Sequence, residues 1–332
     1  MLVYTRAPNR IWKEAALKKR FLIVSLLYAG LLIALWFGFR RSPLAASLDG
    51  NFSRAFASFA ILLAPLWFMG FDTTDLLRRL PRPAQVAIAT LFALPYFVFN
   101  AGTAAFGWQF AAIMIALPVV LSAIVAVPGV LGRMHWRDGI VIAAITVTYF
   151  LKLLSPAWGG LTFFPKLFLA DIVLYCFLVV RALEGTGYSL VPTGSAVWTG
   201  MRELVFYVPL AIVAGESVGF IHFHPAADDL DRVIGAVLLT FLLIAIPEEL
   251  FFRSILQNIL ESRFGRRPAL LLAAAIFGLS HFNHGPGFNW KYVLLASVAG
   301  IFYGRAWRAN RQIFASVVTH TAVDVVWLLW FR

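Results

Sequence analysis

Charged residues are scarce in this sequence. They make up 13% of the 332 residues, against 61% hydrophobic residues, and the mean hydropathy is +0.82. About a quarter of the residues of an average soluble protein are charged, so this composition excludes an ordinary soluble domain and predicts a membrane protein. Cysteine occurs once. Cys176 cannot form an intrachain disulfide, and its place in LADIVLYCFLVV predicts a small buried hydrophobic side chain.

Acidic residues are fewer than basic ones. The chain has 16 Asp and Glu against 28 Lys and Arg, a net charge of +12. Such a surplus indicates nucleic-acid binding when it gathers on one face or along one helix. Here the basic residues lie between hydrophobic runs instead, as topology signals do. We therefore expect membrane lipids, and no nucleic acid, among the partners.

Hydrophobic runs that approach the ~20 residues of a membrane-spanning helix recur along the whole chain. They lie at 21–39, 55–71, 84–106, 109–132, 139–154, 167–181, 203–219, 233–260, 268–282, 291–306 and 313–331. Several are short or interrupted by proline, which membrane helices tolerate because neighbouring groups satisfy the freed carbonyl. The first run is longer than the hydrophobic part of a signal peptide, so we interpret it as an uncleaved helix. The sequence predicts an all-α, polytopic bundle of about 8–11 transmembrane helices.

Lys and Arg residues are unevenly divided among the connecting segments. If eleven runs alternate from a cytoplasmic N-terminus, 19 of the 28 basic residues fall on the cytoplasmic side and 7 on the other, with Lys152 and Arg253 inside runs. The seven are Arg40, Arg41, Arg54, Lys166, Arg232, Lys291 and Arg332. Cytoplasmic loops carry an excess of Lys and Arg. The split predicts a cytoplasmic N-terminus and an extracytoplasmic C-terminus.

One polar stretch, EGTGYSLVPTGS at 184–195, interrupts the succession of hydrophobic runs. Its Gly and Ser residues are typical of a connecting segment. We expect it to separate an N-terminal transmembrane helical region of unknown role, residues 1–195, from a C-terminal region, residues 196–332.

Ionisable residues inside hydrophobic runs are costly, and each one indicates a function. Run 233–260 contains AIPEELFFRSIL, in which Glu249 and Arg253 are four residues apart and can pair on one helix face. Glu248 points about 100° away from Glu249 and lacks a partner on its own helix. Such a carboxylate must find a partner on another helix or take up a proton, and either state suits a general base. Taken alone, Glu248 would suit a structural carboxylate equally well.

Histidines follow in the next hydrophobic runs. His281 ends PALLLAAAIFGLSHF, and His320 and Asp324 share a face of the last helix because they are four residues apart. Glu248 and His281 lie 17 and 13 residues from the turn at 265–268, so antiparallel helices would place both about 20–25 Å from that turn. His320 and Asp324 alone would suit a structural hydrogen bond. Together, at matched depth, these residues predict a site.

Three motifs, in this order, resemble a known family. EELFFR is similar to the EExxxR motif, FGLSH to the FxxxH motif and HTAVD to the HxxxN/D motif of the CAAX prenyl endopeptidase and bacteriocin-processing (CPBP, or ABI) intramembrane proteases. The resemblance covers about 233–331, or extends from 196, and does not reach the first two hundred residues. It implies that residues 196–332 form an intramembrane peptidase core that cleaves a membrane-associated protein or peptide, lipidated in some relatives.

For the site, the resemblance implies four catalytic and two supporting residues: Glu248, His281, His320 and Asp324, supported by Glu249 and Arg253. The first glutamate and the first histidine would activate the water that attacks a peptide carbonyl. His320 and residue 324 would stabilise the developing oxyanion.

Position 324 departs from the prenyl-protein proteases, which have Asn there. An Asn side chain can donate a hydrogen bond to an oxyanion, whereas ionised Asp324 cannot. Asp324 could instead orient His320 or bind a metal. Two histidines with carboxylates suit zinc, although the sequence has no HExxH motif, and the family has been described both as metalloproteases and as glutamate proteases. We expect metal-independent chemistry and keep zinc as the alternative.

A second class of function fits the same residues. A transporter or assembly scaffold without catalytic activity could use the buried glutamate and histidines to bind protons or ions. A peptidase needs both Glu248 and His281 for cleavage, whereas a scaffold keeps its phenotype without them. The resemblance implies a multi-pass protein of a bacterial cell membrane and leaves the substrate open.

Overall fold

The structure, a computed structural model, describes residues 10–48, 50–126, 134–226, 229–285 and 287–331. Within these ranges the chain is helical, and the extended contacts are limited to an isolated bridge between Phe223 and Phe331. The helices are α1 Arg10–Arg40, α2 Pro43–Ser47, α3 Phe52–Met69, α4 Thr74–Arg78, α5 Arg82–Ile88, α6 Leu94–Asn100, α7 Trp108–Val125, α8 Trp136–Phe150, α9 Phe163–Leu174, α10 Gly194–Ser217, α11 Leu230–Leu239, α12 Ile246–Glu249, α13 Asn258–Phe264, α14 Arg266–Leu279, α15 Trp290–Asn310 and α16 Ile313–Trp330. The predicted all-α architecture is confirmed.

In the described part of the chain, each of the eleven predicted runs overlaps a helix or a continuous series of helical segments. In the described part of the chain, eight of these are long and apolar enough to cross a membrane: Lys18–Arg40, Phe52–Met69, Arg82–Asn100, Trp108–Val125, Phe163–Val180, Gly194–Ser217, Leu230–Phe264 and Ile313–Trp330. The other three runs form α8, α14 and α15. The first two have 15 and 14 residues, and the third carries Lys291, Arg305 and Arg308. The predicted range of 8–11 spans therefore holds, and the chain is a multi-pass membrane protein.

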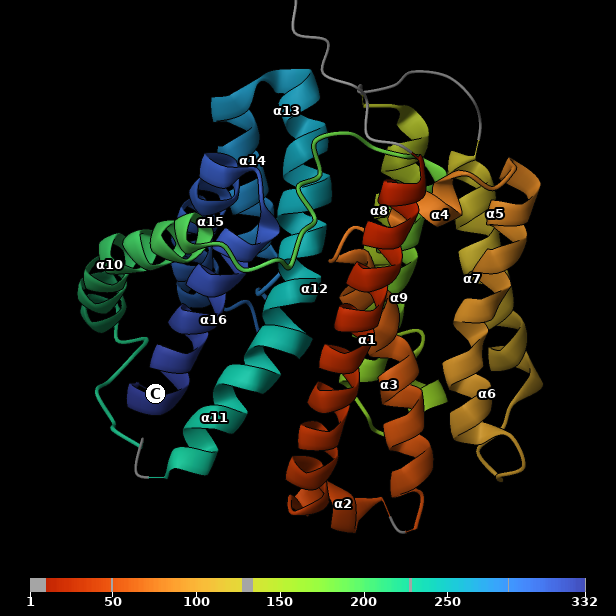
Figure 1. The fold of residues 1–332 in the computed structure, drawn as a ribbon. Coiled ribbons are helices and arrows are strands. Elements are labelled where there is room, and N and C mark those ends of the chain that lie inside the picture. Colours follow the sequence, from red (N-terminus) through yellow and green to blue (C-terminus); the bar gives the residue numbers. More distant parts are fainter. Residues whose placement is uncertain (1–9, 49, 127–133, 227–228, 286, 332) are drawn as a thin grey trace, which may run out of the picture.

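The helices form two groups that lie side by side (Figure 1). Helices α1 to α9 make one group, and α10 to α16 make the other, with the long helical run Leu230–Phe264 lying next to the first group. Helix α1 begins at the upper end of the bundle and α16 ends at the lower end. Residues 184–193, where we predicted a boundary, form no helix and lead into α10.

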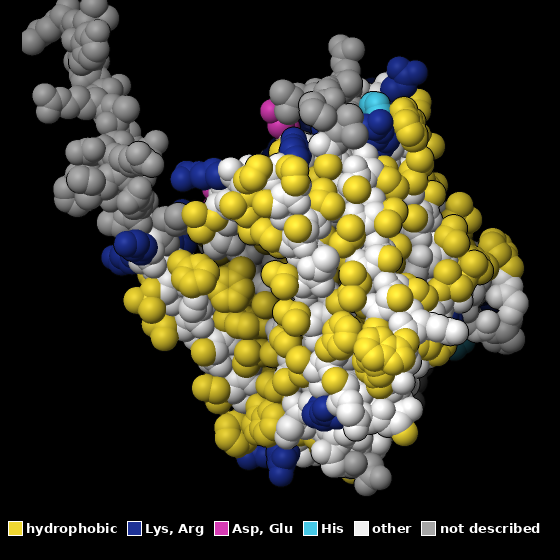
Figure 2. Space-filling view, turned by 90° about the vertical axis from the view of Figure 1, so that its right-hand side faces the viewer, with side chains coloured by type: hydrophobic (Ala, Val, Ile, Leu, Met, Phe, Trp, Pro, Cys, Tyr) yellow, Lys and Arg dark blue, Asp and Glu magenta, His cyan; other side chains and the backbone are white. Residues whose placement is uncertain are grey.

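The outer surface is hydrophobic. Figure 2 shows one face on which apolar side chains cover the middle, while Lys and Arg lie toward its two ends. Large apolar side chains such as Trp108, Trp198 and Leu230 are more than two-thirds exposed. A soluble monomer rarely exposes apolar patches of this extent, so this surface fits contact with lipid.

Helix α9 is the buried centre of the first group. With the π-helical segment Tyr175–Val180 that continues it, it forms a span in which 89% of the residues are buried. The helix begins at Phe163, four residues before the predicted run, because Pro165 is tolerated in a first helical turn. Lys166 therefore lies inside a span, and its predicted place in an outer segment is wrong. Arg6, Arg133 and Arg332, which entered the charge count, lie outside the described residues.

Candidate active site

The two adjacent glutamates lie on α12, between two π-helical segments. Thr240–Ala245 precedes α12 and Leu250–Gln257 follows it, so α11 to α13 form one continuous helix with widened turns. π-Helical turns occur frequently at functional sites because they re-aim side chains. Glu249 is fully buried, whereas Glu248 faces a cavity. The two carboxylates diverge, as expected for neighbours on a helix.

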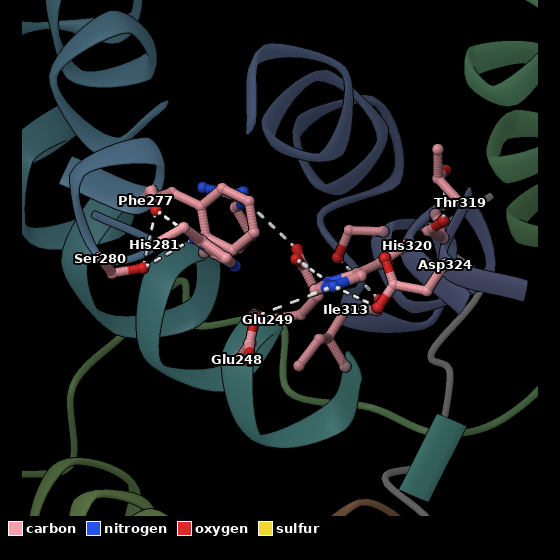
Figure 3. A network of polar contacts seen from close by, with 12 residues as sticks. Glu248, Glu249, Phe277, Ser280, His281, Ile313, Thr319, His320 and Asp324 are labelled. Carbon is pink, nitrogen blue, oxygen red and sulfur yellow. Dashed lines mark hydrogen bonds and ion pairs between the residues drawn. The ribbon is translucent and has the colours of Figure 1, made fainter. Parts of the chain in front are cut away.

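Glu249 uses both of its carboxylate oxygens. Arg253 Nε donates a hydrogen bond to Oε2 over 3.1 Å, so the predicted pair on one helix face is present. His320 Nδ1 donates to Oε1 over 2.8 Å. Figure 3 shows Glu249 reaching from its helix toward His320 on α16. Glu249 therefore joins the first and third motifs directly, a contact that the sequence did not reveal.

Arg253 is completely buried among aromatic rings. Its guanidinium carbon lies 4.9 Å from the centroid of the Phe277 ring and 5.8 Å from that of Tyr303. Its two terminal nitrogens have no hydrogen-bond partner among the described residues. Arginine stacks favourably on aromatic faces when it is desolvated. Arg253 thus packs α14 and α15 around the ion pair with Glu249.

His320 presents its second ring nitrogen to the cavity. Nε2 lies 3.5 Å from Asp324 Oδ2 and 3.8 Å from Glu248 Oε2. The ring stacks on Tyr303, with centroids 4.5 Å apart and planes 16° apart. Because Nδ1 is bound to Glu249, the carboxylate that orients this histidine is Glu249. Asp324 instead lies beside Nε2, the nitrogen that faces the cavity.

His281 lies in the turn that follows α14. Its Nδ1 is 2.9 Å from the carbonyl oxygen of Phe277. Since a carbonyl can only accept a hydrogen bond, Nδ1 carries the proton and Nε2 is left as an acceptor. The ring packs against Tyr292, with centroids 4.8 Å apart, and stacks with His284 at 5.4 Å. The histidine is thus fixed with an unprotonated nitrogen available to a ligand.

A single cavity of about 700 Å³, with predominantly apolar walls, unites these residues. All four predicted catalytic residues line it, among them Glu248 and His281, which we expected at one depth. Helices α8 and α9 of the first group line it as well, through Tyr149 and Leu169. The structure therefore brings together all three motifs and adds a wall from the N-terminal region.

Lys166 of α9 is the site residue that the sequence analysis missed. Its Nζ lies 2.6 Å from Glu248 Oε1. The other oxygen, Oε2, is buried and has no hydrogen-bond partner among the described residues. A signal was present, because a lysine in the apolar stretch TFFPKLFLADIVL is costly unless paired. The partner, 82 positions away, could not be identified from the sequence.

The donor set does not fit a metal centre. Among the described residues, no three His, Cys, Asp or Glu side chains are arranged so that they could hold a metal ion. His320 uses Nδ1 to bind Glu249, and its Nε2 lies beside Asp324 and Glu248. We therefore derive no catalytic step through a metal.

Comparison with known proteins finds one family that is similar to part of the chain. Residues 231–326 match the family described as type II CAAX prenyl endopeptidase, Rce1-like. The matched segment contains Glu248, His281, His320 and Asp324, and it excludes Lys166. No curated protein and no solved structure matches the chain significantly.

Proposed function

We propose that this protein is an intramembrane endopeptidase, because residues 231–326 match the type II CAAX prenyl endopeptidase family. It hydrolyses a peptide bond of a membrane-associated protein or peptide. The observation that supports this proposal best is the convergence of Glu248, His281, His320 and Asp324 on one apolar cavity within the bundle. An ionisable cluster in such a place indicates a reaction or a transport site.

The geometry suggests a division of roles. Glu248 Oε2, which has no hydrogen-bond partner within the described part of the chain, takes the proton from a water molecule, and His281 Nε2 accepts a hydrogen bond from the same water. The hydroxide attacks the peptide carbonyl carbon. His320, as an imidazolium whose Nδ1–H is held by Glu249, uses Nε2–H to stabilise the oxyanion. Glu248 then returns the proton to the leaving amine as the C–N bond breaks.

Comparative peptidomics of membranes tests the proposed function. Membranes that contain the wild-type protein should release peptides that are missing when Glu248→Ala or His281→Ala replaces it. A phenotype that survives both substitutions, with no difference in peptides, would overturn the proposal in favour of a scaffold. Substrate flux into proteoliposomes would instead indicate a transporter.

We also propose that the N-terminus is cytoplasmic and the C-terminus extracytoplasmic. The 19 basic residues counted on one side, against 6 on the other once Lys166 is left out, favour this orientation, and α1 begins at the opposite end of the bundle from the end of α16. Reporter fusions at residues 1 and 332 should be active on opposite sides of the membrane. Two ends on the same side would contradict the eleven-crossing topology.

Asp324→Asn distinguishes metal-independent from metal-dependent chemistry. We expect this variant to keep or increase cleavage, because an amide adjacent to His320 Nε2 adds a hydrogen-bond donor where the carboxylate repels an oxyanion. The measurement is cleavage by the purified variant, with and without chelator, alongside metal analysis of the wild-type protein. Stoichiometric metal that is lost together with activity would overturn the metal-independent assignment.

A further inference from the structure

The N-terminal region contributes a charged group to the candidate active site. Lys166, in the first turns of α9, lies outside the segment that matches the protease family. Its Nζ contacts Glu248 Oε1 over 2.6 Å, and the side chains of both residues are only 17% exposed. Ten of the twelve residues of α9 are buried, so packing fixes the backbone from which Lys166 reaches Glu248.

We propose that Lys166 is a positioning residue for Glu248. This inference rests on the proposed endopeptidase function. The ammonium group binds Oε1 and keeps the carboxylate ionised in an apolar cavity. Oε2 is thereby left as the oxygen that faces His320 and takes the proton from water. The N-terminal region, whose role could not be predicted from the sequence, completes the active site.

The charges around Glu248 support this role. Arg253, the other cation nearby, is already bound to Glu249. Within the described ranges, Lys166 is the lysine or arginine whose ammonium or guanidinium nitrogen contacts Glu248. The remaining groups near Glu248 are His320 and Asp324 of α16 and His281 after α14. Without Lys166, three carboxylates would share this site with one arginine and the histidines, which strongly disfavours an ionised Glu248.

Lys166 also determines which oxygen of Glu248 is available for catalysis. A carboxylate with both oxygens free can rotate and present either one to a substrate. Here Oε1 is occupied by Lys166, and Oε2 lies 3.8 Å from His320 Nε2. The distance leaves Oε2 close to the oxyanion-stabilising nitrogen without a hydrogen bond to it. One water between Glu248, His281 and a substrate carbonyl would therefore meet one oriented oxygen of Glu248.

The first experiment measures catalysis by Lys166→Met, Lys166→Gln and Lys166→Arg. The probe is a quenched fluorescent peptide carrying the cleavage site found by peptidomics. We expect kcat to fall by about 10²-fold or more in the Met and Gln variants, as when a general base is impaired, with KM little changed. Lys166→Arg, which keeps the positive charge, should recover a large part of kcat. Lys152→Met removes an exposed lysine that does not line the cavity and serves as the control.

Thermal stability separates a positioning role from a purely structural one. Lys166→Met and Glu248→Gln should each lower the melting temperature, and the double variant should recover much of the loss, because no unpaired charge remains. If the folded fraction of Lys166→Met and Lys166→Gln retains wild-type kcat, the lysine is structural and the inference is overturned. If the wild-type protein cleaves nothing, the proposed function fails, whereas the stability cycle still reports whether the ion pair exists.

Discussion

Glu248→Gln should lower kcat for peptide cleavage by about 10²–10⁴-fold, the range over which general bases contribute. The glutamine has nearly the same shape and still offers an oxygen to the Lys166 ammonium, so the helix packing around α12 is kept. It cannot accept a proton from water at this position. The loss should therefore appear in kcat rather than in KM, and the protein should remain folded at the assay temperature although its melting temperature is lower.

The control for this variant is Glu216→Gln. Glu216 lies on α10, is exposed and does not line the cavity, so the same chemical change there should leave cleavage unaffected. Single-turnover cleavage of the quenched peptide and a thermal melt are measured for both variants. Substantial activity in a fully folded Glu248→Gln protein would show that another group takes the proton.

Arg253→Ala should destabilise the folded protein by about 3–5 kcal/mol, the cost typical of leaving a buried charge without its partner. Both residues of the Glu249–Arg253 pair are completely buried. Removing the guanidinium also leaves a gap between the rings of Phe277 and Tyr303. Glu249 would keep His320 as a partner but would lose the charge of Arg253. Cleavage should fall because Glu249, which orients His320, would no longer be held in place by Arg253.

Unfolding in denaturing detergent measures this effect, with Arg20→Ala as the matched control. Arg20 is paired with Asp72 over 3.2 Å, but both side chains are more than half exposed. Exposed pairs contribute about 0–1 kcal/mol, so the control should barely shift the transition. An Arg253→Ala protein as stable as the control would show that the buried pair does not hold the helices together.

The membrane class and the helical architecture could be predicted from composition and from the recurrence of apolar runs. A bilayer requires every backbone group to be satisfied within its own helix, so runs such as 55–71 could be assigned without knowledge of their neighbours. Helix ends were less accurate. Helix α9 begins earlier than its apolar run, because the run was counted from beyond Lys166, a residue whose charge is compensated elsewhere in the bundle.

The geometry of the candidate site within single helices could also be predicted from the sequence. Helical periodicity determines which residues share a face, and it correctly paired Glu249 with Arg253 and turned Glu248 another way. Counting residues from a turn determines depth, and Glu248 and His281 do line one cavity. These are properties of single helices or of helices joined by a short turn, so the sequence by itself specifies them.

Contacts between distant helices were decided by the tertiary structure alone. The bonds from Lys166 to Glu248 and from His320 to Glu249 join residues 82 and 71 positions apart. Periodicity gives the direction of a side chain on its helix, but the rotation and neighbours of that helix depend on packing with all the others. For this reason the sequence could pair His320 only with Asp324, four residues away, and His320 Nε2 does lie 3.5 Å from Asp324 Oδ2. The bond from His320 Nδ1 to Glu249, and the lysine from the N-terminal region, depend on how the helices pack.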